Sequence, residues 1–120
     1  MAAIAPTIPS IGENGDDTIR IVWTPVTEND TCNPVYFPDH PIKSIQALGT
    51  FGSATVAVQG SNDGGTTFAA LHSVGVTAIA ITSAGVNPIV ENTEQIKPVM
   101  TGGSSQSLTL ALVVHRTNRP

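Results

Sequence analysis

Apolar and polar residues alternate with a period of two along much of this chain, which is the pattern of β-strands with one buried face. The clearest case is residues 53–71, where Val56 and Val58 alternate with more polar neighbours. The run Gly-Ser-Asn-Asp-Gly-Gly follows at residues 60–65, and apolar residues resume at Phe68. Because Asp-Gly between two such runs is a strong hairpin signal, this stretch predicts a β-hairpin in the middle of an antiparallel sheet.

The same alternation predicts strands before and after this hairpin. Residues 18–24 carry isoleucine and tryptophan at every second position until Pro25, which is expected to end the strand. Residues 107–115 give the longest alternation, with leucine or valine at every second position. The remaining strand candidates are residues 42–49, 77–82, 86–90 and 95–100. Of these, we expect 86–90 at an edge or in a loop because of Pro88, and 95–100 at an edge.

No segment keeps a 3.6-residue apolar period over ten residues, so we expect at most one helical turn, near residues 92–95. Seven or eight short strands between Gly, Pro and Asn turns predict an all-β fold. The expected architecture is an antiparallel β-sandwich of immunoglobulin-like or jelly-roll-like type. We expect one domain over residues 16–120.

An extended N-terminal arm is predicted for residues 1–15, which are interrupted by prolines and glycines. Ile4, Ile8 and Ile11 are spaced along this arm and would be costly to leave in water. They are therefore expected to lie either across their own domain or on a neighbouring subunit.

A second proline-rich stretch covers residues 25–41 and predicts a long irregular loop. Loops longer than about 12–15 residues are usually functional or disordered. Val35, Tyr36 and Phe37 lie inside it, in a chain with only 4% aromatic residues. They are expected either to close one end of the sandwich or to form a contact patch for a partner.

Charged residues make up only 12% of the chain, about half of the usual share for a soluble domain. Either much of the surface lies against other protein, or it is covered with uncharged polar side chains. The net charge of −4, with five Lys and Arg, predicts no nucleic-acid binding. The single cysteine, Cys32, forms no intrachain disulfide, and neither a signal peptide nor an apolar run of membrane-spanning length is expected.

Catalytic and metal-binding patterns are not found in the sequence. His40, His72 and His115 have no neighbours at metal-ligand spacing, so no metal or cofactor is expected. The turn at residues 62–65 lacks the alternating acidic ligands of a calcium loop. Neither a nucleophile elbow nor a phosphate-binding Gly-Lys pair occurs, and nothing favours Cys32 as a nucleophile. We therefore expect no enzymatic activity.

The hairpin at residues 52–68 resembles one found in small structural proteins of tailed bacteriophages. Residues 97–103, with the strand that follows at 107–115, resemble their C-terminal half, so the resemblance spans roughly residues 45–116. A similar Gly-Ser-x-Asp-Gly turn occurs in discoidin-like carbohydrate-binding sandwiches. This chain has Phe68 where those modules often carry Trp, and it lacks their usual disulfide.

The phage resemblance implies a virion structural protein that is made in the host cytoplasm. The role it implies is head decoration (cement) on the capsid exterior, where such proteins clamp adjacent capsid subunits. The expected partners are the major capsid protein and further copies of this chain, as a dimer or trimer, without nucleic acid or membrane. The candidate contact residues are Ile4, Ile8, Ile11, Val35, Tyr36 and Phe37. The alternatives are a carbohydrate-binding module of a tail or adhesin, and a tail or connector component.

Overall fold

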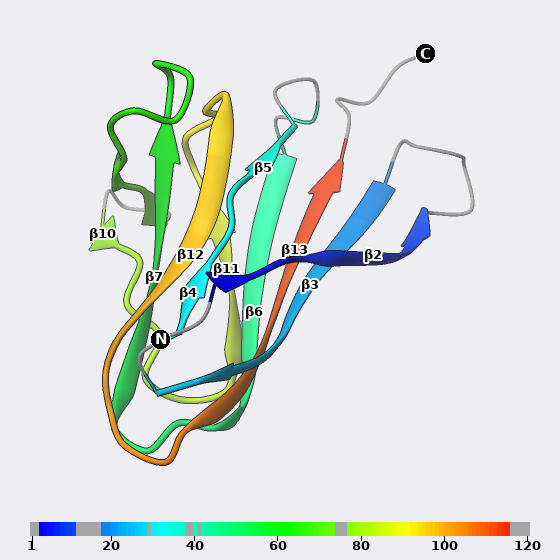
Figure 1. Ribbon diagram of the computed structural model, residues 1–120. Helices are drawn as coiled ribbons and strands as arrows, with labels where there is room; N and C mark the ends of the chain where they lie inside the picture. The colour runs from blue at the N-terminus through cyan, green and yellow to red at the C-terminus, as the bar shows by residue number, and fades with distance from the viewer. Residues whose placement is uncertain are drawn as a thin grey trace.

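The computed structural model describes residues 3–11, 18–28, 30–37, 40, 42–73 and 77–115. Throughout these residues the chain forms strands, turns and loops without any helix. Figure 1 shows the longer strands in two layers, with β7 and β12 in one and β6, β13 and β3 in the other. In the part of the chain that is described, no helix is long and apolar enough to span a membrane.

The first layer is a five-stranded sheet in which all neighbouring strands are antiparallel. Its order is β11 (Gly85–Ile89), β6 (Ile42–Thr50), β13 (Ser107–His115), β3 (Thr18–Thr27) and β2 (Thr7–Ile11). The strand β13, which has the longest alternation, lies at its centre. The Pro88-containing β11 lies at an edge, which confirms one of the two placements predicted for residues 86–90.

The second layer is a four-stranded antiparallel sheet. Its order is β5 (Val35–Tyr36), β12 (Gln95–Gly102), β7 (Ala54–Ser61) and β8 (Ala69–Ala70). The predicted hairpin is confirmed, since Gln59 pairs with Ala70 and Gly60 with Ala69. It lies at an edge of the sheet rather than in the predicted middle, because β8 is the outermost strand. Two small pairs complete the fold: β1 (Ala3–Ile4) runs parallel to β4 (Thr31–Cys32), and β9 (His72–Ser73) pairs with β10 (Thr77–Ala78).

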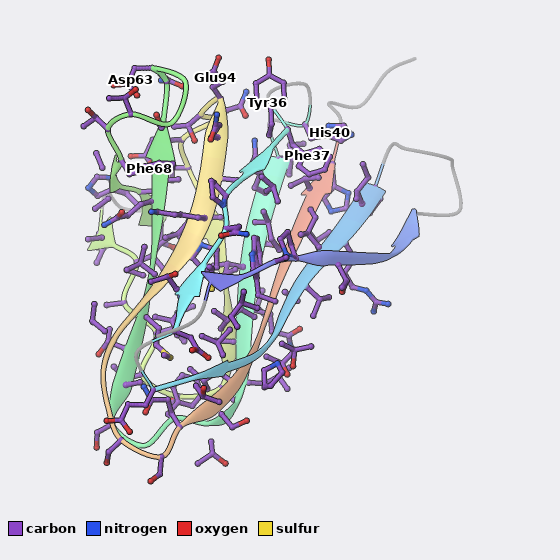
Figure 2. The ribbon with its side chains drawn as sticks, viewed as in Figure 1. Tyr36, Phe37, His40, Asp63, Phe68 and Glu94 are labelled. Atoms are coloured by element: carbon purple, nitrogen blue, oxygen red, sulfur yellow. The ribbon has the colours of Figure 1, made fainter. Side chains whose placement is uncertain are left out.

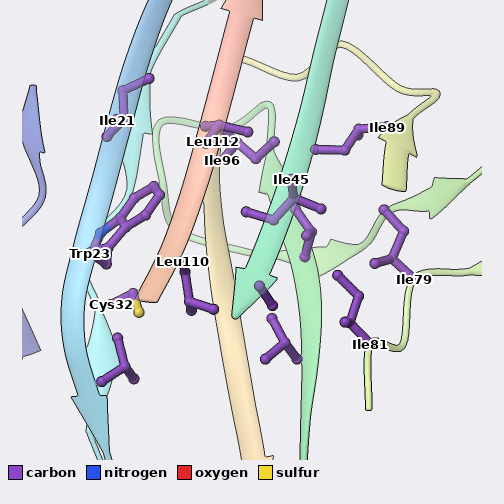
Figure 3. Close-up of a cluster of buried hydrophobic side chains, with 14 of the residues drawn as sticks. Ile21, Trp23, Cys32, Ile45, Ile79, Ile81, Ile89, Ile96, Leu110 and Leu112 are labelled. Atoms are coloured by element: carbon purple, nitrogen blue, oxygen red, sulfur yellow. The ribbon is translucent and has the colours of Figure 1, made fainter. Parts of the chain in front are cut away.

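The all-β antiparallel sandwich predicted from the alternation is confirmed. Seven of the strands in the described residues have five residues or more, and the others have two each. The core lies between the two sheets, where Trp23, Leu110 and Ile45 of one layer face Ile96 of the other, all almost fully buried (Figure 3). Burial of each such side chain contributes about 1.5–3 kcal/mol, so a core of aliphatic residues with one tryptophan holds the layers together.

The prediction that Pro25 ends the first strand is wrong, because β3 continues to Thr27 and buries Val26. The register between β3 and β13 shifts here: Trp23 pairs with Leu110, and Val26 pairs with Leu108. Two residues, one of them Pro25, therefore stand opposite a single residue of β13. Such a bulge leaves a residue outside the ladder, where the missing N–H of proline costs no hydrogen bond.

The prediction of an edge position for residues 95–100 is also wrong, since β12 lies between β5 and β7. The strand β5 pairs only with Gln95 and Ile96, so it ends before Pro98. Pro98 therefore needs no backbone donor on that side, while its other side pairs with Val58 of β7. The short strand β5 comes from the predicted loop at residues 25–41, which thus contains two paired segments, β4 and β5.

The helical turn predicted near residues 92–95 is not formed. Side chains satisfy the backbone here instead: Thr93 Oγ1 donates to the Gln95 carbonyl oxygen (2.8 Å), and the Glu94 N–H donates to Asn62 Oδ1 (2.8 Å). The candidate strand 77–82 is reduced to β10 and one bridge between Ile81 and Val56. Its alternation is nevertheless real, because Ile79 and Ile81 are both buried.

The N-terminal segment lies extended along its own domain in the residues that are described. Thr7, Ser10 and Ile11 pair with β3, and Ile4 packs against the core. The side chains of Ile8 and Ile11 lie outside the described part of the structure. For Ile4, the structure thus shows the first of the two positions expected from the sequence.

Candidate functional site

The most distinctive surface of the protein is the outer face of the five-stranded sheet. Along β6, the side chains of Lys43, Ile45 and Ala47 point into the core and are buried. The alternate positions therefore point outward; they are Ile42, Ser44, Gln46 and Leu48. The register places Val86 of β11 beside Gln46, and Pro88 beside Ser44. We call the outward positions of β11, β6, β13 and β3, together with Val90, the outer face.

Four large apolar side chains are exposed on the outer face. The exposed fractions are 53% for Ile42, 40% for Leu48, 58% for Val86 and 58% for Val90. Scattered exposed apolar residues are ordinary, whereas a group on one face marks a contact site. These four all lie on two adjacent strands or directly after one of them, so they form such a group.

Charge is nearly absent from the outer face. Its positions on β13 and β3 are Thr18, Arg20, Val22, Thr24, Ser107, Thr109, Ala111, Val113 and His115. Arg20 is the one Lys, Arg, Asp or Glu among the outer-face residues that the structure describes. Thr18 Oγ1 and His115 Nδ1 lie within hydrogen-bonding distance (3.0 Å) at one end of the face.

The acidic residues that the structure describes all lie in turns and loops rather than in strands. They are Glu28, Asp30, Asp63, Glu91 and Glu94. Among the residues that the structure describes, negative charge therefore lies outside the outer face. A second protein can approach this face without meeting a carboxylate of the strands.

The open edge beside the outer face is poorly suited to accept another strand. The N–H of Val90 points away from β6 and donates to the carbonyl oxygen of His72 (2.9 Å). Pro88, two residues earlier, faces the same side and has no N–H to offer. Backbone pairing with another strand is thus restricted at this edge, so the outer face is the better surface for contacts with a partner.

The predicted contact residues of the 25–41 loop divide into two kinds. Val35 and Phe37 pack against the core, and the ring of Phe37 meets that of His40 edge-on at 5.5 Å and 90°. Tyr36 is 61% exposed and lies at one end of the sandwich (Figure 2). The loop therefore closes that end with one ring and presents the other to solvent.

The glycine-rich loop near Tyr36 is held by its own side chains. Asp63 Oδ1 accepts hydrogen bonds from Ser61 Oγ (2.7 Å) and from the N–H groups of Thr66 (3.1 Å) and Thr67 (2.9 Å). The bond from Ser61, followed by that from Thr67, holds the pKa of the Asp63 carboxyl below its usual value. Glu94 adds a bond from the Gly64 N–H (2.9 Å). These oxygens stabilise the turn, which is the role predicted from the sequence.

A buried lysine, Lys43, lies at the same end of the sandwich, and its burial was not predicted from the sequence. Lys43 Nζ donates to the His40 carbonyl oxygen (2.7 Å) and to Asn92 Oδ1. Burial lowers the pKa of this amine to about 8. The signal was present in the alternation, because Lys43 has the same parity as Ile45 and Ala47.

Two further ionisable groups, Glu91 and Cys32, have pKa values that are shifted by their surroundings in the fold. Partial burial raises the pKa of Glu91, but hydrogen bonds from the backbone N–H and ring of His72 (2.8 and 2.5 Å) outweigh it and lower the pKa. Burial, with Asp30 nearby, raises the pKa of the Cys32 thiol to about 12. Within the described ranges, no cluster of three His, Cys, Asp or Glu residues could hold a metal ion.

Comparison with known proteins gives similarity in structure but none in sequence. No protein-family model matches the chain, and no characterised protein matches its sequence. The SPBc2 prophage-derived protein YomS superposes with a TM-score of 0.61 at 9% identity, over 81% of this chain and 94% of that one. The two proteins therefore share a fold.

Two further structures are less similar. They are a protein of the disulfide-linked pili of Bacillus endospore appendages (TM-score 0.43, 15% identity, 93% of this chain and 100% of that one) and a Klebsiella pneumoniae protein with a double-stranded β-helix domain (0.45, 10%, 94% and 79%). TM-scores below 0.5 do not establish that these proteins share the fold of this chain.

Proposed function

We propose that this protein is a structural component of a virion, and that it decorates the capsid exterior through protein–protein contacts. The observation that carries the proposal is the outer face, on which Ile42, Leu48, Val86 and Val90 are exposed and Arg20 is the one charge in the described positions. A face of this kind is unfavourable in water and becomes favourable when another protein covers it. The role needs a rigid body with contact surfaces, and it needs no catalytic group.

The shared fold with a prophage-derived protein supports this proposal. Tyr36 is the candidate for a second contact, because its ring is exposed while its neighbours anchor the loop in the core. Tyrosine is enriched at interfaces, since it offers a large apolar area with a polar end. On a repetitive lattice, weak contacts at two such surfaces add up through avidity.

The test is to locate the protein in virions produced by the strain that carries its gene. Density maps of intact particles are expected to show many copies on the head exterior. Particles that lack the protein are expected to lose DNA at lower temperature than complete particles. Density confined to the tail would contradict decoration and favour the tail or connector role. Absence from purified particles would contradict a virion role altogether.

A further inference from the structure

The exposed apolar residues of the outer face form two pairs. Ile89 pairs with Lys43, so the next residue, Val90, lies opposite Ile42. Val86 pairs with Gln46 and is thus a diagonal neighbour of Leu48 on the same face. Ile42 and Leu48 are six positions apart on β6, which corresponds to about 20 Å. One apolar pair therefore lies near each end of β6.

This spacing is self-complementary. A two-fold axis that lies in the plane of contact and crosses β6 near Ile45 exchanges the two ends of the strand. It places Ile42 and Val90 of one copy on Leu48 and Val86 of the other, twice in the same dimer. A two-fold interface uses the same patch on both subunits in this way. Two such sheets would pack face to face at about 10 Å, as in a β-sandwich.

The size of the face is sufficient for a dimer. Four strands spaced by about 4.8 Å, with nine residues of about 3.3 Å along β6, cover roughly 600 Å². Two copies would bury about 1,200 Å², the lower limit of standard stable interfaces. The described acids lie in turns, so two copies with net negative charge meet without carboxylates of the strands facing one another.

The open edge does not offer an equally good route to a dimer. The N–H of Val90 already donates to His72, and Pro88 removes the next donor on that side. Edge-to-edge strand addition would leave this part of the ladder incomplete. A second copy is thus better placed on the face than beside it.

We propose that the partner covering the outer face is a second copy of this chain, related by a two-fold axis near Ile45. The inference rests on the proposed function only in taking the outer face as a protein contact. It leaves Tyr36, at the end of the sandwich, for the contact with the capsid.

The test measures the association of the purified full chain by sedimentation velocity. The wild-type protein is expected to be a dimer. Val86→Glu and Ile42→Lys each place a charge in the apolar contact and are expected to raise the dissociation constant at least about a hundredfold. Because these two positions meet across the interface, mixing the two variants is expected to restore association. Tyr36→Lys adds a charge off the face, and as a control it is expected to remain dimeric.

A wild-type protein that stays monomeric at about 100 µM would overturn the inference. The inference would also be overturned if both variants remained dimeric, or if mixing the two variants did not restore association. Circular dichroism checks that each variant is folded. If one is not, Val90→Lys replaces Ile42→Lys, and Leu48→Glu replaces Val86→Glu, since each lies beside the residue that it replaces. A monomeric wild type that still occupies virion heads would refute the dimer but not the proposed function. A dimeric protein that is absent from virions would refute the proposed function but not the dimer.

Discussion

At the scale of single residues, Lys43 makes the stability of the protein depend on pH. Its pKa is about 8 when folded and near 10.5 when exposed, so between these values the unfolded chain binds more protons. The free energy of unfolding is therefore expected to rise as pH increases from about 8 to about 9, by on the order of 1 kcal/mol. Above about pH 9 the Cys32 thiol opposes this rise, because its pKa is raised from 9.0 to about 12 in the folded protein. Urea denaturation at a series of pH values measures this.

The variant Lys43→Met is expected to abolish that rise, because it removes the titrating amine. Lys97→Met is the matched control and should retain it, since Lys97 lies over the ring of Phe68 (4.3 Å) rather than in the interior. A flat pH profile for the wild-type protein would show that Lys43 is hydrated in solution.

Cys32 is the second residue with a testable environment. Its thiol is buried and its pKa is raised to about 12, so both access and thiolate formation are suppressed. A thiol reagent at pH 8 is expected to label the native protein at least about a hundredfold more slowly than the urea-unfolded protein. Equal rates in the two states would mean that the β4 segment opens readily.

At the scale of elements, Gly60 determines how closely β7 approaches the loop before β12. A Cβ at this position would lie 2.3 Å from Thr93 Oγ1 and 2.8 Å from Thr93 Cγ2. Gly60→Ala is therefore expected to lower the free energy of unfolding by about 1–3 kcal/mol. Gly85→Ala on β11 is the matched control, because the nearest atom to its added Cβ would be the Ser83 carbonyl oxygen at 3.8 Å.

Thermal unfolding followed by the fluorescence of the buried Trp23 distinguishes the two glycine variants. Gly60→Ala is expected to show a clearly lower midpoint, and Gly85→Ala a midpoint close to that of the wild type. Equal midpoints for all three proteins would mean that Thr93 moves aside without cost.

The strands could be predicted because alternation is a local property of the sequence. The burial of Val56 and of Leu110 can be predicted from the few residues on either side of each. The prolines show where this reasoning fails: the pattern predicts a strand end at Pro25 and an edge position for residues 95–100, which contain Pro98. Whether proline is tolerated depends on a missing partner, either at the bulge opposite β13 or past the end of β5. That information lies elsewhere in the chain.

The contact surface was harder to predict for a related reason. Alternation separates inward from outward positions, but it does not say which strands share a sheet. Val86 and Ile42 belong to one patch only because β11 pairs with β6. The sequence pointed instead to the aromatic residues of the 25–41 loop, of which the structure leaves Tyr36 exposed.

At the scale of the whole molecule, the position of the described acidic residues, all outside the outer face, predicts how association responds to salt. Contacts steered by opposite charges weaken as salt screens them, whereas burial of apolar surface does not. The dissociation constant of the proposed dimer is therefore expected to change less than about threefold between 0.05 and 1 M NaCl. The Val86→Glu and Ile42→Lys mixture is the internal control, because its restored contact is ionic and should weaken with salt. A wild-type dimer that dissociates at high salt would point to Arg20 and the loop carboxylates, rather than the four apolar side chains, as the source of affinity.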